Sequence, residues 1–270
     1  MPSSQPIYLF TALACEAKPF IDCFKLKKRH DLHVFSVYQK DNIHLIVTGI
    51  GQPAMAAGVA YLLALSPPST LPILINIGVA GHKEYAVGSL FIADKIINAY
   101  QAKCYYPQLV AKIPCDSANV MTVLQVEEQY LEPVLYDMEA AAFYEIASRF
   151  SSQELIHCFK VISDNQHTEI KRIKPAHISE WIYAARQPIC DYIQALTLLA
   201  QACSSVETPY YAELIQQQHF THNEKIQLKS LLAKRAILKP LDDLNVSTGS
   251  GADILKSLNA ELLAHPFGGF

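Results

Sequence analysis

Leu135-Tyr-Asp-Met-Glu-Ala-Ala-Ala-Phe-Tyr-Glu-Ile-Ala-Ser-Arg-Phe150 is the stretch that decides the fold of this chain. After Asp137, apolar and small side chains recur at helical spacing, which predicts a helix that enters a core with its acidic end first. Glu139 is then expected in the first turn, where the helix dipole stabilises a carboxylate by under about 1 kcal/mol. Asp137 and Glu139 therefore form either a capping pair or part of a functional site.

A further carboxylate ends a later apolar run. Cys158-Phe-Lys-Val-Ile-Ser-Asp164 predicts a buried strand, and Asp164 would open into a cleft if that strand is parallel to its neighbours. Lys160 shares a face with Asp164 by strand alternation. A cation in a buried strand needs a carboxylate partner, and Asp137 or Glu139 is the expected one.

Composition limits the classes of protein to consider. The chain has 270 residues, 51% hydrophobic and 17% charged, so it can bury a large core and is predicted to be one α/β domain with room for an extension. A net charge of -3 gives no indication of a nucleic-acid or anionic-membrane partner. The seven cysteines are scattered, which favours reduced thiols, a cytoplasmic location and no metal site.

The apolar run from Ile7 to Cys15 superficially resembles the cleavage region of a lipoprotein. No basic residue precedes it, and it barely reaches the length of about 7 residues that a signal peptide needs. We therefore expect a buried first strand there. Since no apolar run approaches about 18 residues, no membrane span is expected.

Short apolar runs alternate with helical patterns through the first 204 residues. We expect strands near 7–13, 34–39, 43–48, 71–77, 88–97, 118–126 and 158–163, and helices near 53–65, 138–150 and 178–203. The segment 98–114 is predicted to be an irregular loop long enough to be functional. This alternation predicts an α/β sandwich with a mainly parallel or mixed sheet.

A change in composition at Ser204-Ser-Val-Glu-Thr-Pro209 predicts a domain boundary between residues 1–204 and a helical C-terminal extension, 205–270. Helices are expected near 210–218, 223–238 and 253–263, with a flexible loop at 246–252. Thr221 and Glu224 have the spacing of a capping box. The extension is compatible with a helical subdomain, a partner-binding arm or a lid, and packing against the first domain is the expected arrangement.

Two kinds of site have little support. Gly49-Ile-Gly-Gln-Pro-Ala54 matches the G-x-G-x-x-A pattern of a dinucleotide site, but the acidic residue required about 20 positions later is absent. A tight strand-to-helix turn is the simpler interpretation. Catalysis by a serine or thiol lacks the G-x-S-x-G elbow, and Cys15 is the one thiol expected at a strand end.

Three carboxylates at the ends of predicted elements favour a third kind of site. Glu16 follows the first strand, Glu139 lies at the central helix and Asp164 ends the late strand. Such a set suits cleavage of a glycosyl bond, in which one acid assists the leaving group, a second carboxylate activates the nucleophile and a third holds sugar hydroxyls.

Five short motifs, in order and at natural spacings, resemble the nucleoside phosphorylase and nucleosidase superfamily over about residues 7–203. The motifs are Thr11-Ala-Leu-Ala-Cys-Glu16, Val47-Thr-Gly-Ile-Gly51, Ile75-Asn-Ile-Gly-Val-Ala-Gly81 with Val87-Gly88, Asp137-Met-Glu-Ala-Ala141 and Val161-Ile-Ser-Asp164. The resemblance implies a phosphorylase/hydrolase-like three-layer sandwich with a mixed central sheet. It also implies a homo-oligomer, most simply a homodimer, in which the aromatic loop Tyr100–Pro107 could supply part of the contact.

Similarity to methylthioadenosine/adenosylhomocysteine nucleosidases within the superfamily implies the site. There, the position matching Glu16 activates the attacking water, and the position matching Asp164 donates a proton to purine N7. The implied catalytic residues are therefore Asp164 and Glu16. The implied substrate-binding residues are Glu139, which would hold the ribose hydroxyls, and Met138, Ser163, Val79, Ala80, Gly81, Gln125 and Val126. No cofactor and no metal are implied.

Two positions separate this chain from the phosphorylases of the superfamily. Those enzymes have an arginine for phosphate where this chain has Asn76, and a serine where it has Val79. Without a bidentate cation and a hydroxyl, little remains to hold a dianion. We therefore expect hydrolysis of a purine-type nucleoside to free base and sugar. A phosphorylase with a differently built phosphate site and a non-catalytic nucleoside-binding or scaffold protein are the alternatives.

Overall fold

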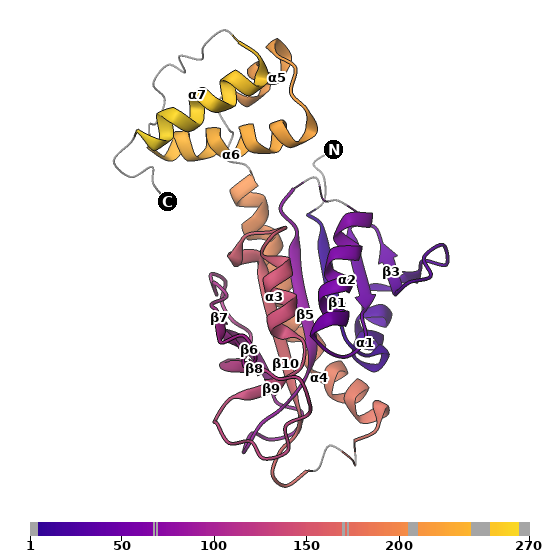
Figure 1. The fold of residues 1–270 in the computed structure, drawn as a ribbon. Helices are drawn as coiled ribbons and strands as arrows, with labels where there is room; N and C mark the ends of the chain where they lie inside the picture. Colours follow the sequence, from indigo (N-terminus) through magenta and orange to yellow (C-terminus); the bar gives the residue numbers. More distant parts are fainter. Residues whose placement is uncertain are drawn as a thin grey trace. The chain divides into compact units, whose positions relative to one another are not determined.

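The computed structural model describes residues 5–66, 68, 70–168, 171, 173–204, 210–238 and 249–264. Contacts within the chain divide it into two compact units, Met1–Ala202 and Cys203–Phe270. The sheet and its covering helices belong to the first unit, and three further helices among the described residues belong to the second (Figure 1).

One sheet, with ten strands among the described residues, runs through the first unit. The strands are β1 (Ile7–Thr11), β2 (Lys27–Lys28), β3 (Ser36–Lys40), β4 (Ile43–Val47), β5 (Ile73–Gly81), β6 (Leu90–Asn98), β7 (Lys103–Tyr105), β8 (Asp116–Thr122), β9 (Leu135–Asp137) and β10 (Ile156–Asp164). Their order is β10-β6-β8-β9-β5-β1-β4-β3-β2, with β7 beside β6. β5 is parallel to β1 and β10 but antiparallel to β9, so the predicted mixed sheet is confirmed.

A direct pairing of β5 with β10 closes part of this sheet into a ring, which runs β5-β10-β6-β8-β9 and returns to β5. β1 accompanies the first half of β5, from Ile73 to Asn76, and β9 pairs at Gly81, where β1 has already ended. The residues of β5 from Ile73 to Gly78 are all buried. Burial on both faces explains why this strand has an almost continuous apolar sequence.

Helices cover both faces of the sheet. They are α1 (Ala14–Phe24), α2 (Gln52–Leu65), α3 (Ala140–Ala147) and α4 (Pro175–Ser204), with a short 3-10 helix at Gln153–Leu155. α2 and α3 contribute to one cluster of buried side chains, and α1 and α4 contribute to another. Neighbouring residues of β1 divide between the two, Leu9 in the second and Phe10 in the first, as strand alternation requires.

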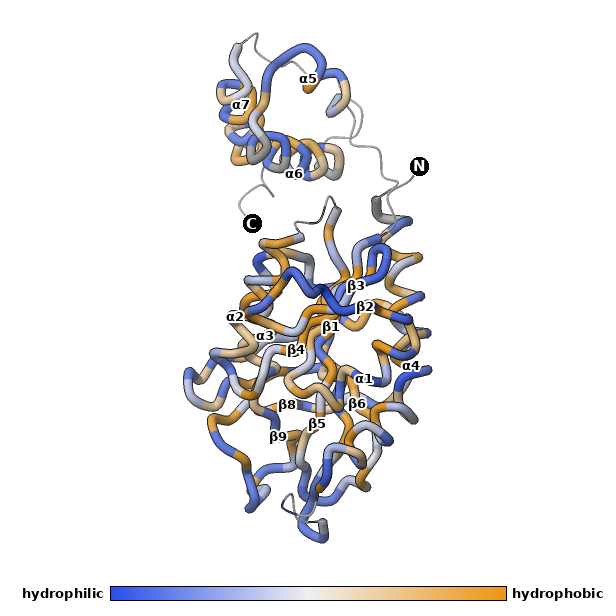
Figure 2. Tube along the Cα trace, turned by 90° about the vertical axis from the view of Figure 1, so that its right-hand side faces the viewer, coloured by the Kyte–Doolittle hydropathy of each residue, from blue (hydrophilic) through white to orange (hydrophobic). Residues whose placement is uncertain are grey.

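This arrangement confirms the three-layer α/β sandwich. In Figure 2 hydrophobic residues gather along the central strands, whereas the connecting loops at the lower end are more hydrophilic. None of the helices in the described part of the chain has the length and apolar character needed to cross a membrane.

The structure differs from the sequence prediction near β5 and α3, and it contains α1, β2, β7 and β9, which the sequence analysis did not predict. The strand expected at 71–77 continues to Gly81 as β5, because β10 pairs alongside as far as Gly81. Helix α3 begins at Ala140, so Glu139 is its N-cap residue and not part of the first turn, and the residues before it form β9. The segment 98–114 includes the short strand β7, and β8 ends at Thr122, before the predicted Val126.

The second unit has a core of its own. Its helices are α5 (Tyr211–Gln217), α6 (His222–Leu238) and α7 (Gly251–Leu263), which bury Leu214, Phe220, Leu228 and Ile254 among others. The predicted capping box is confirmed, since Thr221 N donates to Glu224 Oε2 at 2.7 Å and Glu224 N donates to Thr221 Oγ1 at 3.4 Å. The loop predicted at 246–252 lies mostly outside the described residues, and α7 already begins at Gly251.

Candidate active site

Glu16 lies in the first turn of α1, directly after β1. Its Oε2 accepts hydrogen bonds from the N–H groups of Ala12 and Leu13, each at 2.9 Å, and its Oε1 accepts one from Val79 N at 3.1 Å. Burial raises the pKa of the Glu16 carboxyl, although these N–H groups and the ammonium of Lys160 oppose the change. A carboxylate with a raised pKa is suited to accept a proton from water near neutral pH.

Lys160 is enclosed by carboxylates. Its Nζ lies 2.7 Å from Asp137 Oδ2, with the two side chains 1% and 0% exposed. Burial alone would lower the pKa of Lys160, but the carboxylates of Asp137 and Glu139 outweigh burial and raise it. The predicted ion pair of this lysine is therefore confirmed, and its partner is Asp137.

Asp137 is held by its neighbours as well as by the lysine. Thr122 Oγ1 donates to its Oδ1 at 2.6 Å, and its Oδ2 accepts from Glu139 N at 3.2 Å and Ala140 N at 2.7 Å. These N–H groups belong to the start of α3 and have no partner within the helix. Asp137 therefore fixes the start of α3, and with it the backbone of Glu139.

Glu139 is positioned by the glycine turn at the start of α2. Gly51 N donates to Glu139 Oε1 at 2.7 Å. Gly49 and Gly51 have φ angles of 90° and 95°, which glycine adopts readily. The turn that matched a dinucleotide pattern thus directs its N–H at a carboxylate of the protein itself. Burial, reinforced by the nearby charge of Asp137, raises the pKa of Glu139 to about 7.

Asp164 ends β10, and both of its carboxylate oxygens accept hydrogen bonds from hydroxyl groups. Ser163 Oγ donates to Oδ1, and Tyr130 Oη donates to Oδ2. A Cβ atom at Gly81 would lie 2.6 Å from Asp164 Oδ2 and 2.8 Å from Tyr130 Cε1. The close approach of these side chains to β5 therefore requires glycine at residue 81.

β5 connects the two groups of side chains. A Cβ atom at Gly78 would lie 3.2 Å from Glu16 Oε1 and 3.4 Å from Lys160 Nζ, whereas Gly81 lies against Asp164. At about 3.3 Å per residue, these two points on the strand are roughly 10 Å apart. Glycosidases that use a water as nucleophile separate their two carboxyl groups by about 6.5–9.5 Å. The spacing along β5 is of the order that such chemistry needs.

The structure brings most of the predicted site residues to this end of β5 and β10. Val79 donates to Glu16 through its N–H, Ala80 O accepts from Ser163 Oγ at 3.4 Å, and Met138 lies half-buried between Asp137 and Glu139. Gln125 and Val126 are exposed on the segment between β8 and β9, and the described contacts do not connect them to the carboxylates.

Two side chains at the site were missed by the sequence analysis. Thr122 ends β8, and its hydroxyl donates to Asp137 and accepts from Ala141 N at 2.9 Å. Because the strand was predicted to run from 118 to 126, Thr122 lay in its middle and nothing in the sequence marked it as a strand end. Tyr130 lies in the segment that follows, which has no periodic pattern, so nothing there pointed to Asp164.

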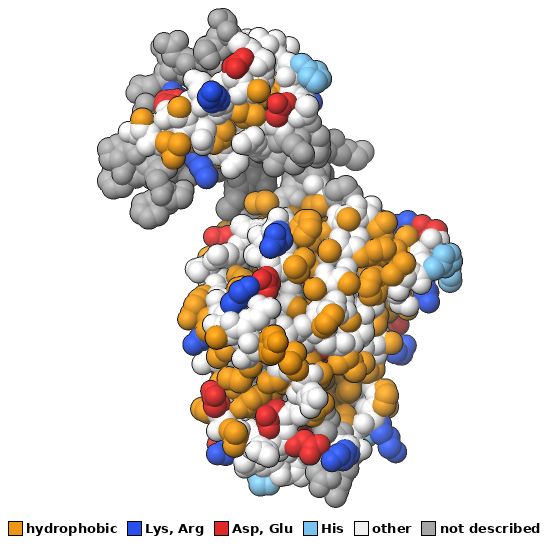
Figure 3. Space-filling model, in the orientation of Figure 1, with side chains coloured by type: hydrophobic (Ala, Val, Ile, Leu, Met, Phe, Trp, Pro, Cys, Tyr) orange, Lys and Arg blue, Asp and Glu red, His pale blue; other side chains and the backbone are white. Residues whose placement is uncertain are grey.

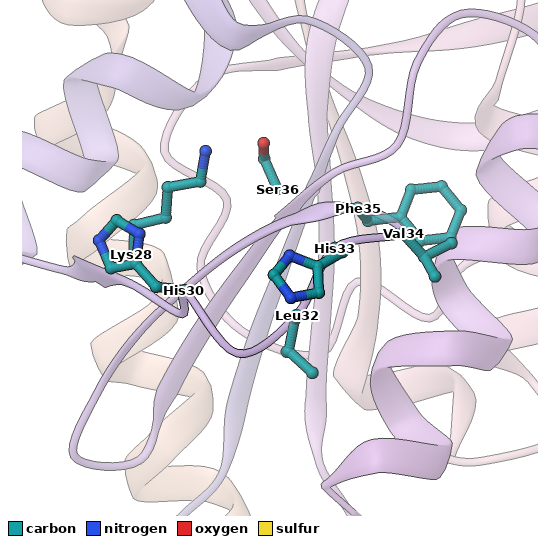
Figure 4. A pocket seen from close by; sticks show the side chains of 7 residues that line it. All are labelled: Lys28, His30, Leu32, His33, Val34, Phe35 and Ser36. Carbon is teal, nitrogen blue, oxygen red and sulfur yellow. The ribbon is translucent and has the colours of Figure 1, made fainter.

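A separate cavity of about 350 Å³ lies on the β2–β3 connection. Figure 4 shows its lining, which includes Lys28, His30, His33 and Ser36. These strands stand at the far end of the strand order from β10. The cavity contains none of the predicted site residues.

No protein-family model and no curated protein matches this chain. Solved structures do match. A 5'-methylthioadenosine/S-adenosylhomocysteine nucleosidase from Helicobacter pylori is 13% identical, with a TM-score of 0.58 over 70% of this chain and 98% of that one. The futalosine hydrolase of the same organism is 12% identical, with a TM-score of 0.58 over 71% and 98%. The 5'-methylthioadenosine nucleosidase of Arabidopsis thaliana is 14% identical, with a TM-score of 0.59 over 70% and 95%.

These matches extend over nearly the whole of each solved chain, and they agree with the motifs that carry the sequence resemblance. The chain therefore has the fold of the nucleoside phosphorylase and nucleosidase superfamily.

Proposed function

We propose that this chain hydrolyses the N-glycosidic bond of a purine-type nucleoside and releases free base and sugar, with residues 1–204 as the catalytic domain and 205–270 as a helical extension. The observation that carries the proposal is that Glu16 lies against Gly78 of β5 and Asp164 lies against Gly81 of the same strand. Glu139 is close enough to Glu16 for the two charges to interact. The scattered cysteines support a cytoplasmic location as part of this proposal.

In the proposed reaction, Glu16 takes a proton from water as the water oxygen bonds to the anomeric carbon of the sugar. The carbon–nitrogen bond breaks, its electron pair passes to the base, and Asp164 supplies a proton to the base nitrogen. Glu139 in its ionised form accepts hydrogen bonds from sugar hydroxyls. Since the pKa of Glu139 is about 7, a substantial fraction of the molecules is ionised at neutral pH.

Phosphorolysis is the second candidate, and the surroundings of Asn76 argue against it. Asn76 is 1% exposed on β5, and its Nδ2 donates to Phe10 O at 3.1 Å. The cation of this region, Lys160, is already paired with Asp137. A phosphate dianion would therefore meet Glu16 and Glu139 without a free cation to balance it among the described residues.

We expect base release to proceed in phosphate-free buffer, because water is the proposed nucleophile. The measurement is chromatography of base and sugar products from a panel of purine nucleosides, with and without added phosphate. Free sugar should form at a rate that phosphate does not change. Strict dependence on phosphate with sugar 1-phosphate as product would establish phosphorolysis, and failure with every nucleoside would favour the non-catalytic alternative.

We also propose a homodimer. Helix α2 has no charged residue, and its exposed residues are Pro53, Ala57, Ala60 and Ala64 along one stripe and Leu65 at its end. The alanines permit close approach. Figure 3 shows hydrophobic side chains gathered on the face of the first unit that carries α2. The aromatic loop adds the exposed Tyr100 and Tyr106 as a second candidate surface.

Sedimentation velocity at micromolar concentration should therefore give the mass of a dimer. Ala60→Arg should shift the protein toward monomer, because it places an unpaired charge in a close apolar contact. Lys18→Ala, on an exposed part of α1, is the matched control and should leave the dimer intact. A wild-type monomer would contradict the proposal.

A further inference from the structure

Tyr130 is a buried side chain in a mostly exposed segment between β8 and β9. It is 4% exposed, whereas residues 124–126, 128–129 and 131–133 are exposed. Its ring packs edge-on against Tyr136, with ring centroids 6.0 Å apart, and belongs to a small cluster with Val134. Backbone N–H groups tie both ends of the segment to β9, Val123 N to Asp137 O at 2.8 Å and Glu132 N to Tyr136 Oη at 2.9 Å, and Tyr130 is the buried side chain between these two points.

The backbone of Tyr130 has a φ angle of 48°, in the left-handed region. A bulky residue rarely adopts this conformation, because its Cβ approaches the following carbonyl oxygen. Such a conformation persists only where surrounding contacts hold it. At Tyr130 these contacts are the packing of the ring and the hydrogen bond from its hydroxyl to Asp164 Oδ2.

The Tyr130 hydroxyl lies where the leaving base would have to contact Asp164 in the proposed reaction. Ser163 Oγ already donates to the other oxygen of Asp164, and Ser163 is a buried residue of the same strand. Each oxygen retains a second lone pair, but the Tyr130 hydroxyl and ring lie against Oδ2 beside Gly81 and obstruct the approach of a base nitrogen to that oxygen. Of the two hydroxyl groups, that of Tyr130 belongs to a loop and can be withdrawn without breaking the sheet.

The Tyr130 ring lies directly beside Gly81 and Asp164. Even a Cβ atom at Gly81 would come within 2.8 Å of the ring, and the ring hydroxyl donates to the carboxylate of Asp164. A purine that reaches Asp164 alongside Gly81 would therefore have to displace this ring.

We infer that Tyr130 controls access to Asp164: its side chain fills the site of the leaving base, and segment 123–134 moves outward when a purine binds. The inference rests on the proposed function, since it assigns the space at Gly81 to the base. Because the binding-competent state is then only a fraction of the population, the apparent dissociation constant for a purine is raised by the inverse of that fraction.

The first test needs no ligand. Amide hydrogen exchange reports local opening, and segment 123–134 should exchange faster in Tyr130→Phe than in wild type because the hydroxyl no longer holds it to Asp164. Tyr106→Phe, at an exposed tyrosine, is the control and should exchange as wild type does. Unchanged exchange in Tyr130→Phe would overturn the inference whatever the protein catalyses.

The second test measures the binding of free adenine and hypoxanthine by calorimetry. Tyr130→Phe should bind the preferred base about tenfold more tightly than wild type, since a hydrogen bond to a charged group is worth at least this factor. Tyr130→Asn removes the ring and suits a positive φ, so it should show an effect at least as large.

If exchange rises but neither variant binds either base more tightly, Tyr130 does not guard a base site and the inference is wrong. Tighter binding supports it even where no nucleoside is hydrolysed, because binding is measured without catalysis. Failure of the proposed hydrolysis is seen separately, in the assay with wild-type protein and nucleosides.

Discussion

Replacing Asp164 by asparagine should lower the turnover number for purine nucleosides by at least about 100-fold. General acid assistance contributes a factor of about 100 to 10,000, and an amide has no proton of comparable acidity to give. Substrate binding should stay within about tenfold of wild type, because the amide N–H can still donate a hydrogen bond to the base. The fold should persist, since the hydroxyls of Ser163 and Tyr130 can each accept as well as donate.

Separate measurement of kcat and KM tests this prediction, since loss of an interaction made only in the transition state lowers kcat at constant affinity. Asp94→Asn is the matched control. Asp94 also accepts a serine hydroxyl, Ser117 Oγ at 2.7 Å, but lies on β6 away from the carboxylates. Wild-type turnover by Asp164→Asn with every nucleoside would show that Asp164 is only a strand-end cap.

Replacing Lys160 by methionine should lower the free energy of unfolding by about 3–5 kcal/mol. Methionine has a similar length, but it leaves Asp137 buried with no cation, and removal of one partner of a buried pair typically costs this much. Denaturant unfolding measures the change. Lys103→Met is the control, because its ion pair with Glu145 is 51% and 31% exposed and is worth under about 1 kcal/mol.

The double variant Lys160→Met with Asp137→Asn should regain part of that loss, because no buried charge is left unpaired. The single variant should also change the pH dependence of activity. Lys160 lowers the pKa of Glu139, so its loss raises that pKa above about 7 and reduces the ionised fraction at neutral pH. The rise of kcat/KM with pH should move to higher pH. A fully stable Lys160→Met with the wild-type pH profile would contradict both expectations.

The layers and most of the longer elements were predictable from the sequence because they follow from hydrophobic periodicity, whereas α1, β2, β7 and β9 were not predicted. β1, β4 and β10 are apolar runs buried along their length or nearly so, and α2 and α4 are long helices with recognisable ends. The ion pair of Lys160 with a carboxylate was also predictable, because burying an ammonium group without a partner costs free energy.

Other features depend on contacts that the sequence does not show. Gly78 and Gly81 have the composition of a turn, yet pairing with β10 holds them in a strand. Glu139 is shifted from the first turn to the N-cap because Asp137 accepts from the N–H groups of residues 139 and 140. Tyr130 lies in an irregular loop and has a positive φ angle, and neither feature produces a periodic pattern in the sequence.

The ring of strands described above also limits the order in which the protein can fold. Leu74 of β5 pairs with Ile156 of β10, and contacts between such distant residues form slowly because a long loop must close first. During synthesis, Glu16, Asp137 and Glu139 all leave the ribosome before Lys160. A nascent chain that ends before β10 therefore holds three acidic side chains whose buried cation has not yet been made. Those carboxylates stay solvated until β10 is made, so the centre of the site should be among the last parts of the first unit to be buried from solvent.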